Sequence, residues 1–139
     1  MRTMTIALVA LAVSAVAGSA MAADPVNGEW LTPSGKARVR IQPCAGHADQ
    51  LCGTIVWMRD PARDENNPNV ALRSRAIVGL PFLTHFRREG PGRWSGGSIY
   101  NPQDGKTYDS KMQIRPGGSL GVSGCVLVFC QTQVWSRAP

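Results

Sequence analysis

The chain has 139 residues, a length that suits one domain, and a formal net charge of +6 at pH 7. Its 15 Lys and Arg residues are scattered and form no block of five or more, which argues against a nucleic-acid-binding protein. Attraction to anionic envelope surfaces is the simpler explanation of the basic charge.

The first 22 residues have the pattern of a secretory signal peptide. A basic start at Arg2 is followed by an apolar stretch, residues 6–17, and by the small-residue cleavage motif Ala20-Met21-Ala22. The apolar stretch is short for a bilayer span, so a retained membrane helix is the weaker alternative. We predict cleavage after Ala22, which leaves residues 23–139 as a single periplasmic or secreted domain without a membrane span.

After the signal, short alternating runs broken by Gly, Pro, Asn and Asp predict strands and no long helix. Early in the mature chain, Val39 and Ile41 alternate with Arg38 and Arg40, so one face of this strand is apolar and the other is basic. We expect the apolar face to point inward. The predicted strands span residues 28–31, 37–42, 51–58, 82–87, 93–100, 106–115, 119–126 and 131–137.

The longest connection, residues 60–69, is polar and rich in turn residues, and a short helical turn is predicted for residues 70–75. Long ordered loops of compact domains often act as functional lids. Calcium needs six to eight oxygen ligands at defined spacing, and no EF-hand-like repeat is present. We therefore predict a solvated loop without a metal, in which the oxygen-bearing side chains are Asp60, Asp64, Glu65, Asn66 and Asn67.

Four cysteines in an exported chain predict two disulfides, for which three pairings exist. A zinc site is the alternative. No Cys-x-x-Cys spacing supports it, only His47 is near the first two cysteines, and His85 lies far along the chain. We therefore predict neither a metal nor a cofactor. The short spacings favour the local pairs Cys44–Cys52 and Cys125–Cys130, each of which would staple a hairpin.

About eight strands in consecutive hairpin order predict an all-β fold, an antiparallel up-and-down barrel closed on itself. An immunoglobulin-like sandwich needs Greek-key crossovers and a cysteine pattern that local pairs do not give. In a closed barrel the first and last strands are neighbours. We therefore predict that Trp30 plugs one end of the barrel and that the Arg137 guanidinium stacks on its indole ring.

Gly28, Trp30 and the terminal Arg137 together resemble the Gly-x-Trp and Arg signature of lipocalin-like (calycin) barrels. Essentially the whole mature chain further resembles an uncharacterised family of exported bacterial proteins, domain of unknown function 2147. The resemblance implies a periplasmic lipocalin-like barrel with no settled activity. Asn101 stands where the family usually has Asp, which argues against a carboxylate role there. The matching segments are GEWL (28–31), LCGTIVW (51–57), NNP (66–68), IYNPQDGKTY (99–108) and QTQVWSR (131–137).

The leading functional hypothesis is a non-enzymatic envelope protein whose barrel binds a small apolar or amphipathic ligand. Tyr100, Lys106 and Tyr108 form the densest polar-aromatic motif and could hold an anionic headgroup at the barrel mouth. A tight hairpin with the two tyrosines as a cross-strand pair is the simpler alternative. The candidate ligand-binding residues are Trp57, Met58, Tyr100, Lys106, Tyr108 and Met112.

Four consecutive apolar residues separate the last two cysteines. We expect this hairpin tip to cover one end of the barrel. The alternative is a partner surface, as in a periplasmic accessory or inhibitor protein that binds an envelope protein. The tip consists of Val126, Leu127, Val128 and Phe129.

An unrecognised enzyme is the third functional class. It would rest on Asp104, Lys106 and Tyr108, a compact set of acid and base groups. The sequence has no Gly-x-Ser-x-Gly elbow, His-Glu-x-x-His motif or glycine-rich phosphate loop. We therefore predict no catalytic residue.

Overall fold

The computed structural model describes residues 12–14 and 23–139, so the predicted signal peptide and its cleavage site lie outside the described residues apart from residues 12–14. Eight strands and two short 3-10 helices form in the described part of the chain. They are β1 (Gly28–Leu31), η1 (Pro33–Gly35), β2 (Ala37–Cys44), β3 (His47–Met58), η2 (Val70–Leu72), β4 (Pro81–Gly90), β5 (Arg93–Asn101), β6 (Lys106–Ile114), β7 (Leu120–Val126) and β8 (Phe129–Arg137).

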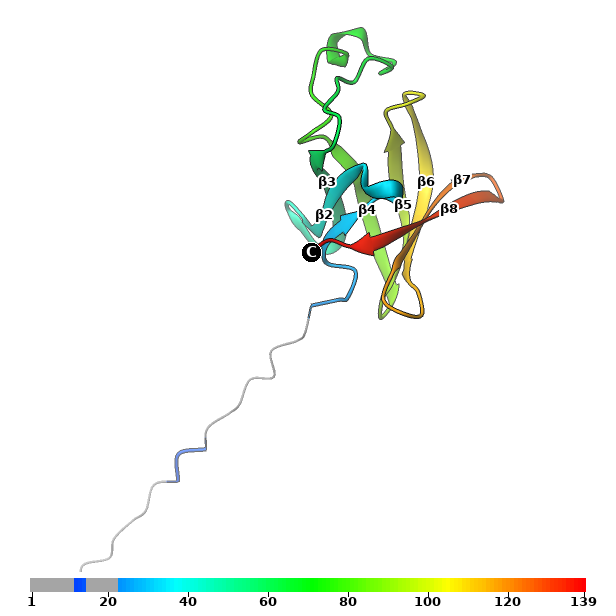
Figure 1. Ribbon diagram of the computed structural model, residues 1–139. Helices are drawn as coiled ribbons and strands as arrows, with labels where there is room; N and C mark the ends of the chain where they lie inside the picture. Colours follow the sequence, from blue (N-terminus) through cyan, green and yellow to red (C-terminus); the bar gives the residue numbers. More distant parts are fainter. Residues whose placement is uncertain (1–11, 15–22) are drawn as a thin grey trace, which may run out of the picture.

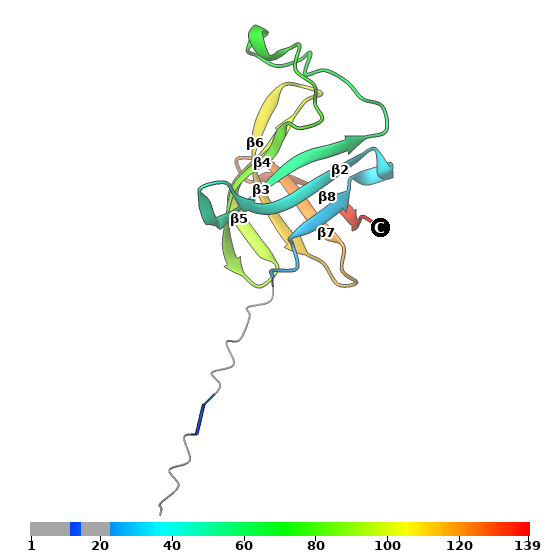
Figure 2. The ribbon, with the colours of Figure 1, turned by 90° about the vertical axis from the view of Figure 1, so that its left-hand side faces the viewer.

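Each strand pairs antiparallel with the next, and β8 returns to β1, so the sheet is a closed eight-stranded barrel (Figures 1 and 2). This confirms the predicted fold. Among the helices of the described residues, none is long and apolar enough to cross a bilayer.

The seam between β1 and β8 contains only two residue pairs, Trp30 with Arg137 and Leu31 with Ser136. Side chains reinforce it. The Arg137 guanidinium lies 3.9 Å from the centre of the Trp30 ring and donates hydrogen bonds of 2.7 Å to the carbonyl oxygens of Asn27 and Pro25. The predicted stacking is confirmed, and these residues close the barrel rather than form a ligand site.

Apolar side chains fill the end of the barrel where β1 begins and β8 ends, here named the closed end. Trp30 is fully buried there and donates its indole N–H to the carbonyl oxygen of Val26 at 2.9 Å. Glycine at position 97 does not leave a void, because a Cβ atom there would lie 2.4 Å from the Phe86 ring. The other large buried side chains at this end include Leu51, Trp94, Met112 and Leu120.

The alternation of inward and outward residues follows the sequence prediction along β2. Val39 and Ile41 are buried, whereas Arg40 is exposed and forms an ion pair of 2.6 Å with Glu29. In β3 the alternation is interrupted. Arg38 pairs with Trp57 but Val39 pairs with Ile55, so Val56 has no partner and forms a bulge.

Two disulfides join neighbouring strands, Cys44–Cys52 between β2 and β3 and Cys125–Cys130 between β7 and β8. Both predicted pairs are confirmed. They lie at opposite ends of the barrel, because β2 ends at the closed end and β7 ends at the other end.

Candidate ligand-binding site

A cavity of about 860 Å³ lies at the end of the barrel where β3 ends and β4 begins, here named the open end. Its size falls within the range of small-molecule sites, and an eight-stranded barrel has room for one small ligand. The strands supply apolar walls because inward residues alternate with outward ones. The apolar lining includes Val39, Ile55, Met58, Phe82, Ile99 and Val122.

Polar groups surround the entrance of this cavity. They come from the segment around η1, from the turn between β5 and β6, and from the start of β8. An apolar interior beneath a polar rim suits a ligand with an apolar body and a polar end. The rim includes Lys36, Asn101, Asp104, Tyr108, Gln131 and Gln133.

The long loop between β3 and β4 extends beyond the open end (Figures 1 and 2). Asp64 anchors it, with a carboxylate that is fully buried. One carboxylate oxygen accepts a hydrogen bond of 2.6 Å from the Tyr100 hydroxyl of β5, and the other accepts bonds from Asn67 at 2.8 Å and Arg75 at 2.9 Å. We call this group of four side chains the latch. The prediction of a solvated loop is therefore wrong for Asp64 and for Asn67, which is also buried.

The latch shifts the pKa values of Asp64 and Tyr100. Burial opposes ionisation of Asp64, but hydrogen bonds from Tyr100, Asn67 and Arg75 and the Arg75 charge outweigh it, so the pKa of this carboxyl lies below its ordinary value of 3.8. Burial and the neighbouring carboxylate raise the pKa of Tyr100 above its ordinary value of 10.0. At neutral pH the latch therefore contains an ionised aspartate and a neutral tyrosine.

Backbone contacts strengthen the docking of the loop. The Asn66 side-chain amide donates to the carbonyl oxygens of Pro102 and Gln103 at 3.1 and 3.0 Å. Gly105 has φ +70°, and a Cβ atom there would lie 1.9 Å from the Asn66 carbonyl oxygen. The turn between β5 and β6 therefore needs glycine both for its conformation and for the close approach of the loop.

The structure brings three of the six predicted ligand-binding residues together. Met58, Tyr100 and Tyr108 line the cavity. The tyrosines are not direct cross-strand partners, because Ile99 pairs with Tyr108 and Tyr100 pairs with Thr107. The expected tyrosine pair is therefore wrong, and Tyr100 instead joins the cavity wall to the latch.

The other three predicted residues lie outside the cavity lining. Trp57 is 44% exposed, and the guanidinium of Arg38 lies 5.9 Å from the centre of its ring. The bulge at Val56 explains this position, because one extra residue turns Trp57 outward and Met58 inward. Lys106 is exposed, and Met112 is buried in the core at the closed end.

The hairpin tip between β7 and β8 is not folded over the barrel. Its four side chains are exposed, so the expectation that they cover one end is wrong. Val126 and Phe129 border the cavity, whereas Leu127 has φ +55° in the two-residue turn and is the most exposed of the four. The exposed fractions are 57% for Val126, 88% for Leu127, 86% for Val128 and 78% for Phe129.

Asp104, Lys106 and Tyr108, the acid and base groups considered for catalysis, stabilise the turn between β5 and β6. The Tyr108 hydroxyl donates to the Asp104 carboxylate, which also accepts the backbone N–H of Lys106 at 2.8 Å. The hydrogen bond with Tyr108 lowers the pKa of Asp104, and the same bond raises the pKa of Tyr108. The Asp104 carboxylate and the Lys106 backbone thus stabilise the hairpin beside the cavity rim.

Sequence reasoning missed the latch and part of the cavity wall. Backbone hydrogen bonds within the loop bring Asp64 close to Arg75 and Asn67: Asp64 N–H donates to the Arg75 carbonyl oxygen at 3.0 Å, and Asn67 N–H donates to the Asp64 carbonyl oxygen at 3.1 Å. The Tyr100 hydroxyl of the distant strand β5 completes the group. The one sequence feature that pointed to this loop was the Asn66-Asn67-Pro68 segment, which is among the segments that resemble the domain of unknown function 2147 family. Phe82 lines the cavity and stacks on Trp135 with ring centres 6.1 Å apart, a contact between β4 and β8 that no local pattern specifies.

Comparison with known proteins agrees with this architecture. A family model described as "Uncharacterized protein conserved in bacteria (DUF2147)" matches residues 28–137. Among solved structures, protein HP1028 from the human pathogen Helicobacter pylori, described as belonging to the lipocalin family, is similar with a TM-score of 0.71 and 24% identity over 82% of this chain and 83% of that chain. At this identity the similarity shows the fold alone. No curated protein matches the chain significantly.

Proposed function

We propose that this chain, which belongs to the DUF2147 family of uncharacterised bacterial proteins, is an exported barrel that binds a small apolar or amphipathic ligand at its open end. The observation that carries the proposal is the cavity of about 860 Å³ with apolar walls and a polar rim. Two disulfides support an oxidising, extracytoplasmic location.

The arrangement of the cavity supports an amphipathic ligand in particular. Ile55, Phe82 and Val122 are apolar and face the interior, so an apolar body placed there gains by leaving water. Lys36 and Asp104 at the rim offer both signs of charge to a polar group. Ile77, from the connection between β3 and β4, adds a further apolar contact to the cavity lining.

Two naphthalene dyes test the proposal, neutral N-phenyl-1-naphthylamine and anionic anilinonaphthalene sulfonate. Gly124 borders the cavity, and a Cβ atom there would lie 3.5 Å from Ile99 and 3.7 Å from Tyr108, so Gly124→Phe places a ring inside without a backbone clash. Gly121 of the same strand faces the other way, toward Arg115 and Thr132, and Gly121→Phe is the matched control.

We expect both dyes to fluoresce with the wild-type chain and Gly124→Phe to weaken binding about tenfold or more, while Gly121→Phe leaves it nearly unchanged. Tighter binding of the anionic dye would assign the polar end of the ligand to an acid. The proposal is wrong if neither dye binds, or if the two variants weaken binding equally.

A second function is favoured by the exposed hairpin tip: an accessory or inhibitor protein that binds an envelope protein through Leu127, Val128 and Phe129. Apolar side chains that protrude together are typical of interaction surfaces. Replacing Leu127 and Phe129 by Ser should abolish photo-crosslinking of the tip to periplasmic protein. Val134→Ser is the control, because Val134 is an exposed apolar residue of the same hairpin. Equal crosslinking in both variants would exclude the tip as a docking site.

A further inference from the structure

The two histidines of the chain lie together beside the Cys44–Cys52 disulfide. Antiparallel pairing of β3 with β4 matches Leu51 with Phe86, which places His85 next to Cys52. The ring centres of His47 and His85 are 6.2 Å apart, with the rings edge to face. The long separation of His85 from the cysteines in the sequence is therefore not a separation in space.

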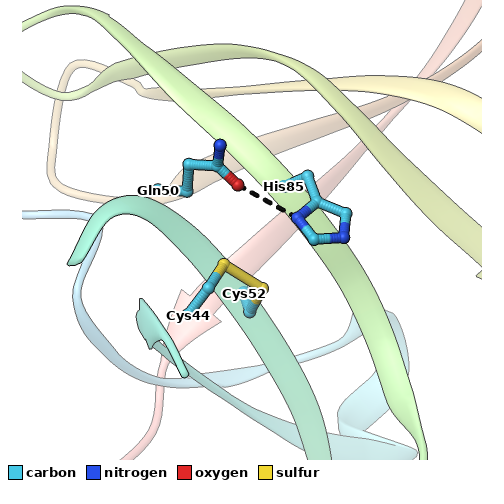
Figure 3. The surroundings of a disulfide bond; sticks show 4 residues. All are labelled: Cys44, Gln50, Cys52 and His85. Atoms are coloured by element: carbon cyan, nitrogen blue, oxygen red, sulfur yellow. Dashed lines mark hydrogen bonds between the residues drawn. A yellow bond between two sulfur atoms is a disulfide. The ribbon is translucent and has the colours of Figure 1, made fainter. Parts of the chain in front are cut away.

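A bulge in β4 directs His85 toward the disulfide. Gly53 pairs with Leu83 and Leu51 pairs with Phe86, so Thr84 and His85 together face Cys52. His85 has φ +58°, a backbone conformation that costs a residue with a side chain free energy. Bulges redirect side chains and are frequent near functional sites. Figure 3 shows the imidazole beside the two sulfur atoms.

A hydrogen bond holds the imidazole ring in this position. The Nδ1 atom of His85 lies 3.0 Å from the side-chain oxygen of Gln50, and a carbonyl oxygen can only accept, so Nδ1 donates (Figure 3). In an imidazole that binds a metal, such a partner usually holds the nitrogen that is not the ligand, so Nε2 is the atom of His85 left to bind an ion.

The donor atoms are close enough for a common metal ion. The sulfur atoms of Cys44 and Cys52 and a ring nitrogen of His85 all lie within 4.8 Å of one another. Bond lengths of about 2.3 Å to sulfur and 2.0 Å to nitrogen place the ligands of tetrahedral zinc roughly 3.5–3.8 Å apart. His47, the cross-strand partner of Cys44, is not among these three donors, and its ring centre lies 6.2 Å from that of His85.

We infer that reduction of the Cys44–Cys52 disulfide converts the cluster of Cys44, Cys52 and His85 into a site for a d10 cation, Zn²⁺ or Cu⁺, which His47 completes as fourth ligand by rotation of its side chain. The oxidised sulfurs are bonded to each other and supply no thiolate. Two thiolates and two imidazoles form a soft, tetrahedral donor set that suits both cations. His47 and His85 are exposed, which gives an ion access from solvent.

The chemistry needs a reductant, and we assign this role to an envelope dithiol. The dithiol transfers two electrons and two protons to the disulfide, leaves as a disulfide itself, and produces the thiols of Cys44 and Cys52. Binding of the cation then displaces both thiol protons and forms two metal–sulfur bonds. The site thus reports the redox state of its surroundings, and it is separate from the ligand cavity because it lies toward the other end of the barrel.

The second disulfide supplies a matched control. Cys125–Cys130 has no histidine nearby, because the two histidines of the chain are both at the first disulfide. The variant Cys125→Ser/Cys130→Ser keeps the proposed site, and Cys44→Ser/Cys52→Ser removes it. Each is reduced with tris(2-carboxyethyl)phosphine, which takes an oxygen atom from water as it cleaves the disulfide, and is titrated with Co²⁺ and then Zn²⁺ without oxygen.

We expect reduced Cys125→Ser/Cys130→Ser to bind one Co²⁺ with sulfur-to-cobalt charge-transfer absorption that Zn²⁺ abolishes. The oxidised form and Cys44→Ser/Cys52→Ser should lack this absorption. In the reduced chain, His85→Ala and His47→Ala should each weaken Zn²⁺ binding about tenfold or more. Loss of a residue that only hydrogen-bonds to a metal ligand already lowers metal affinity about 10–100-fold.

Absence of thiolate–cobalt absorption in reduced Cys125→Ser/Cys130→Ser would overturn the inference, as would unchanged affinity in both histidine variants. Reduction could itself unfold the barrel, and circular dichroism and thermal melting of each reduced chain test for this. A site built in the fold raises the melting temperature or restores the fold when Zn²⁺ is added. If Zn²⁺ does neither, the inference is wrong.

Discussion

Tyr100→Phe removes one hydroxyl from the latch and so measures what this hydrogen bond contributes. The hydroxyl donates to a carboxylate oxygen of Asp64 at 2.6 Å, and the Asp64 side chain is fully buried. Hydrogen bonds to charged groups contribute about 1.5–3 kcal/mol, and a buried acceptor that loses its partner is not rehydrated. Asn67 and Arg75 still bind the other oxygen of Asp64. We therefore expect a loss of about 2 kcal/mol, which lowers the melting temperature by roughly 6–10 °C.

The matched control is Tyr108→Phe. Tyr108 also donates to an aspartate, Asp104, and comes from the same hairpin, but that aspartate is exposed. Water replaces a lost partner at an exposed carboxylate, so we expect the midpoint of urea unfolding to move little. Hydrogen exchange of residues 64–76 should increase in Tyr100→Phe and stay unchanged in Tyr108→Phe. Equal effects of the two substitutions, or none from Tyr100→Phe, would refute the latch.

Three further outcomes follow from the structure. The pKa of Asp64 is lowered, so the stability that the ionised carboxylate gives the fold is complete above the ordinary value of 3.8 and is lost as the pH falls through the folded-state pKa. Hydrogen exchange should therefore show the loop undocking in acid. In Tyr100→Phe the loop should undock at a higher pH than in wild type. Gly105→Ala should undock the loop, whereas Gly117→Ala, which has φ +90° and nothing within 4 Å, should show only the backbone cost of about 1–2 kcal/mol in urea unfolding. Arg137→Ala should destabilise the barrel by about 1–2 kcal/mol through loss of the Trp30 stack, with Arg115→Ala as a neutral control in the same assay.

The parts of the fold that were predictable from the sequence are set by neighbours along the chain. Alternation in residues 37–42 and turn residues such as those at 101–105 specify strands and hairpins, and a hairpin brings its own cysteines together. The position of Trp30 beside Arg137 was also predictable, because closure of consecutive hairpins makes the first and last strands neighbours.

The parts that were not predictable depend on a shift of one residue or on contacts between distant segments. One extra residue at Val56 turns Trp57 outward, and another in β4 turns His85 toward the disulfide. A bulge has no strong sequence signal, yet it reverses the face of every later residue in its strand. Asp64 looked solvated because aspartate in a polar loop usually is, but Tyr100 of a distant strand and Asn67 and Arg75 of its own loop all bind its carboxylate.

The placement of Tyr100 links the loop to the cavity. Its ring lines the cavity while its hydroxyl holds Asp64, so a ligand that binds the docked state more tightly than the undocked state stabilises docking of the loop. By thermodynamic linkage, docking of the loop must strengthen ligand binding by the same factor. Tyr100→Phe keeps the ring and loses the latch, so a fall in dye affinity in this variant would come from the loop rather than from lost contact. The same dye should slow hydrogen exchange of residues 64–76 in the wild-type chain and slow it less in Tyr100→Phe. Exchange that is indifferent to a bound dye would show that the loop does not control the cavity.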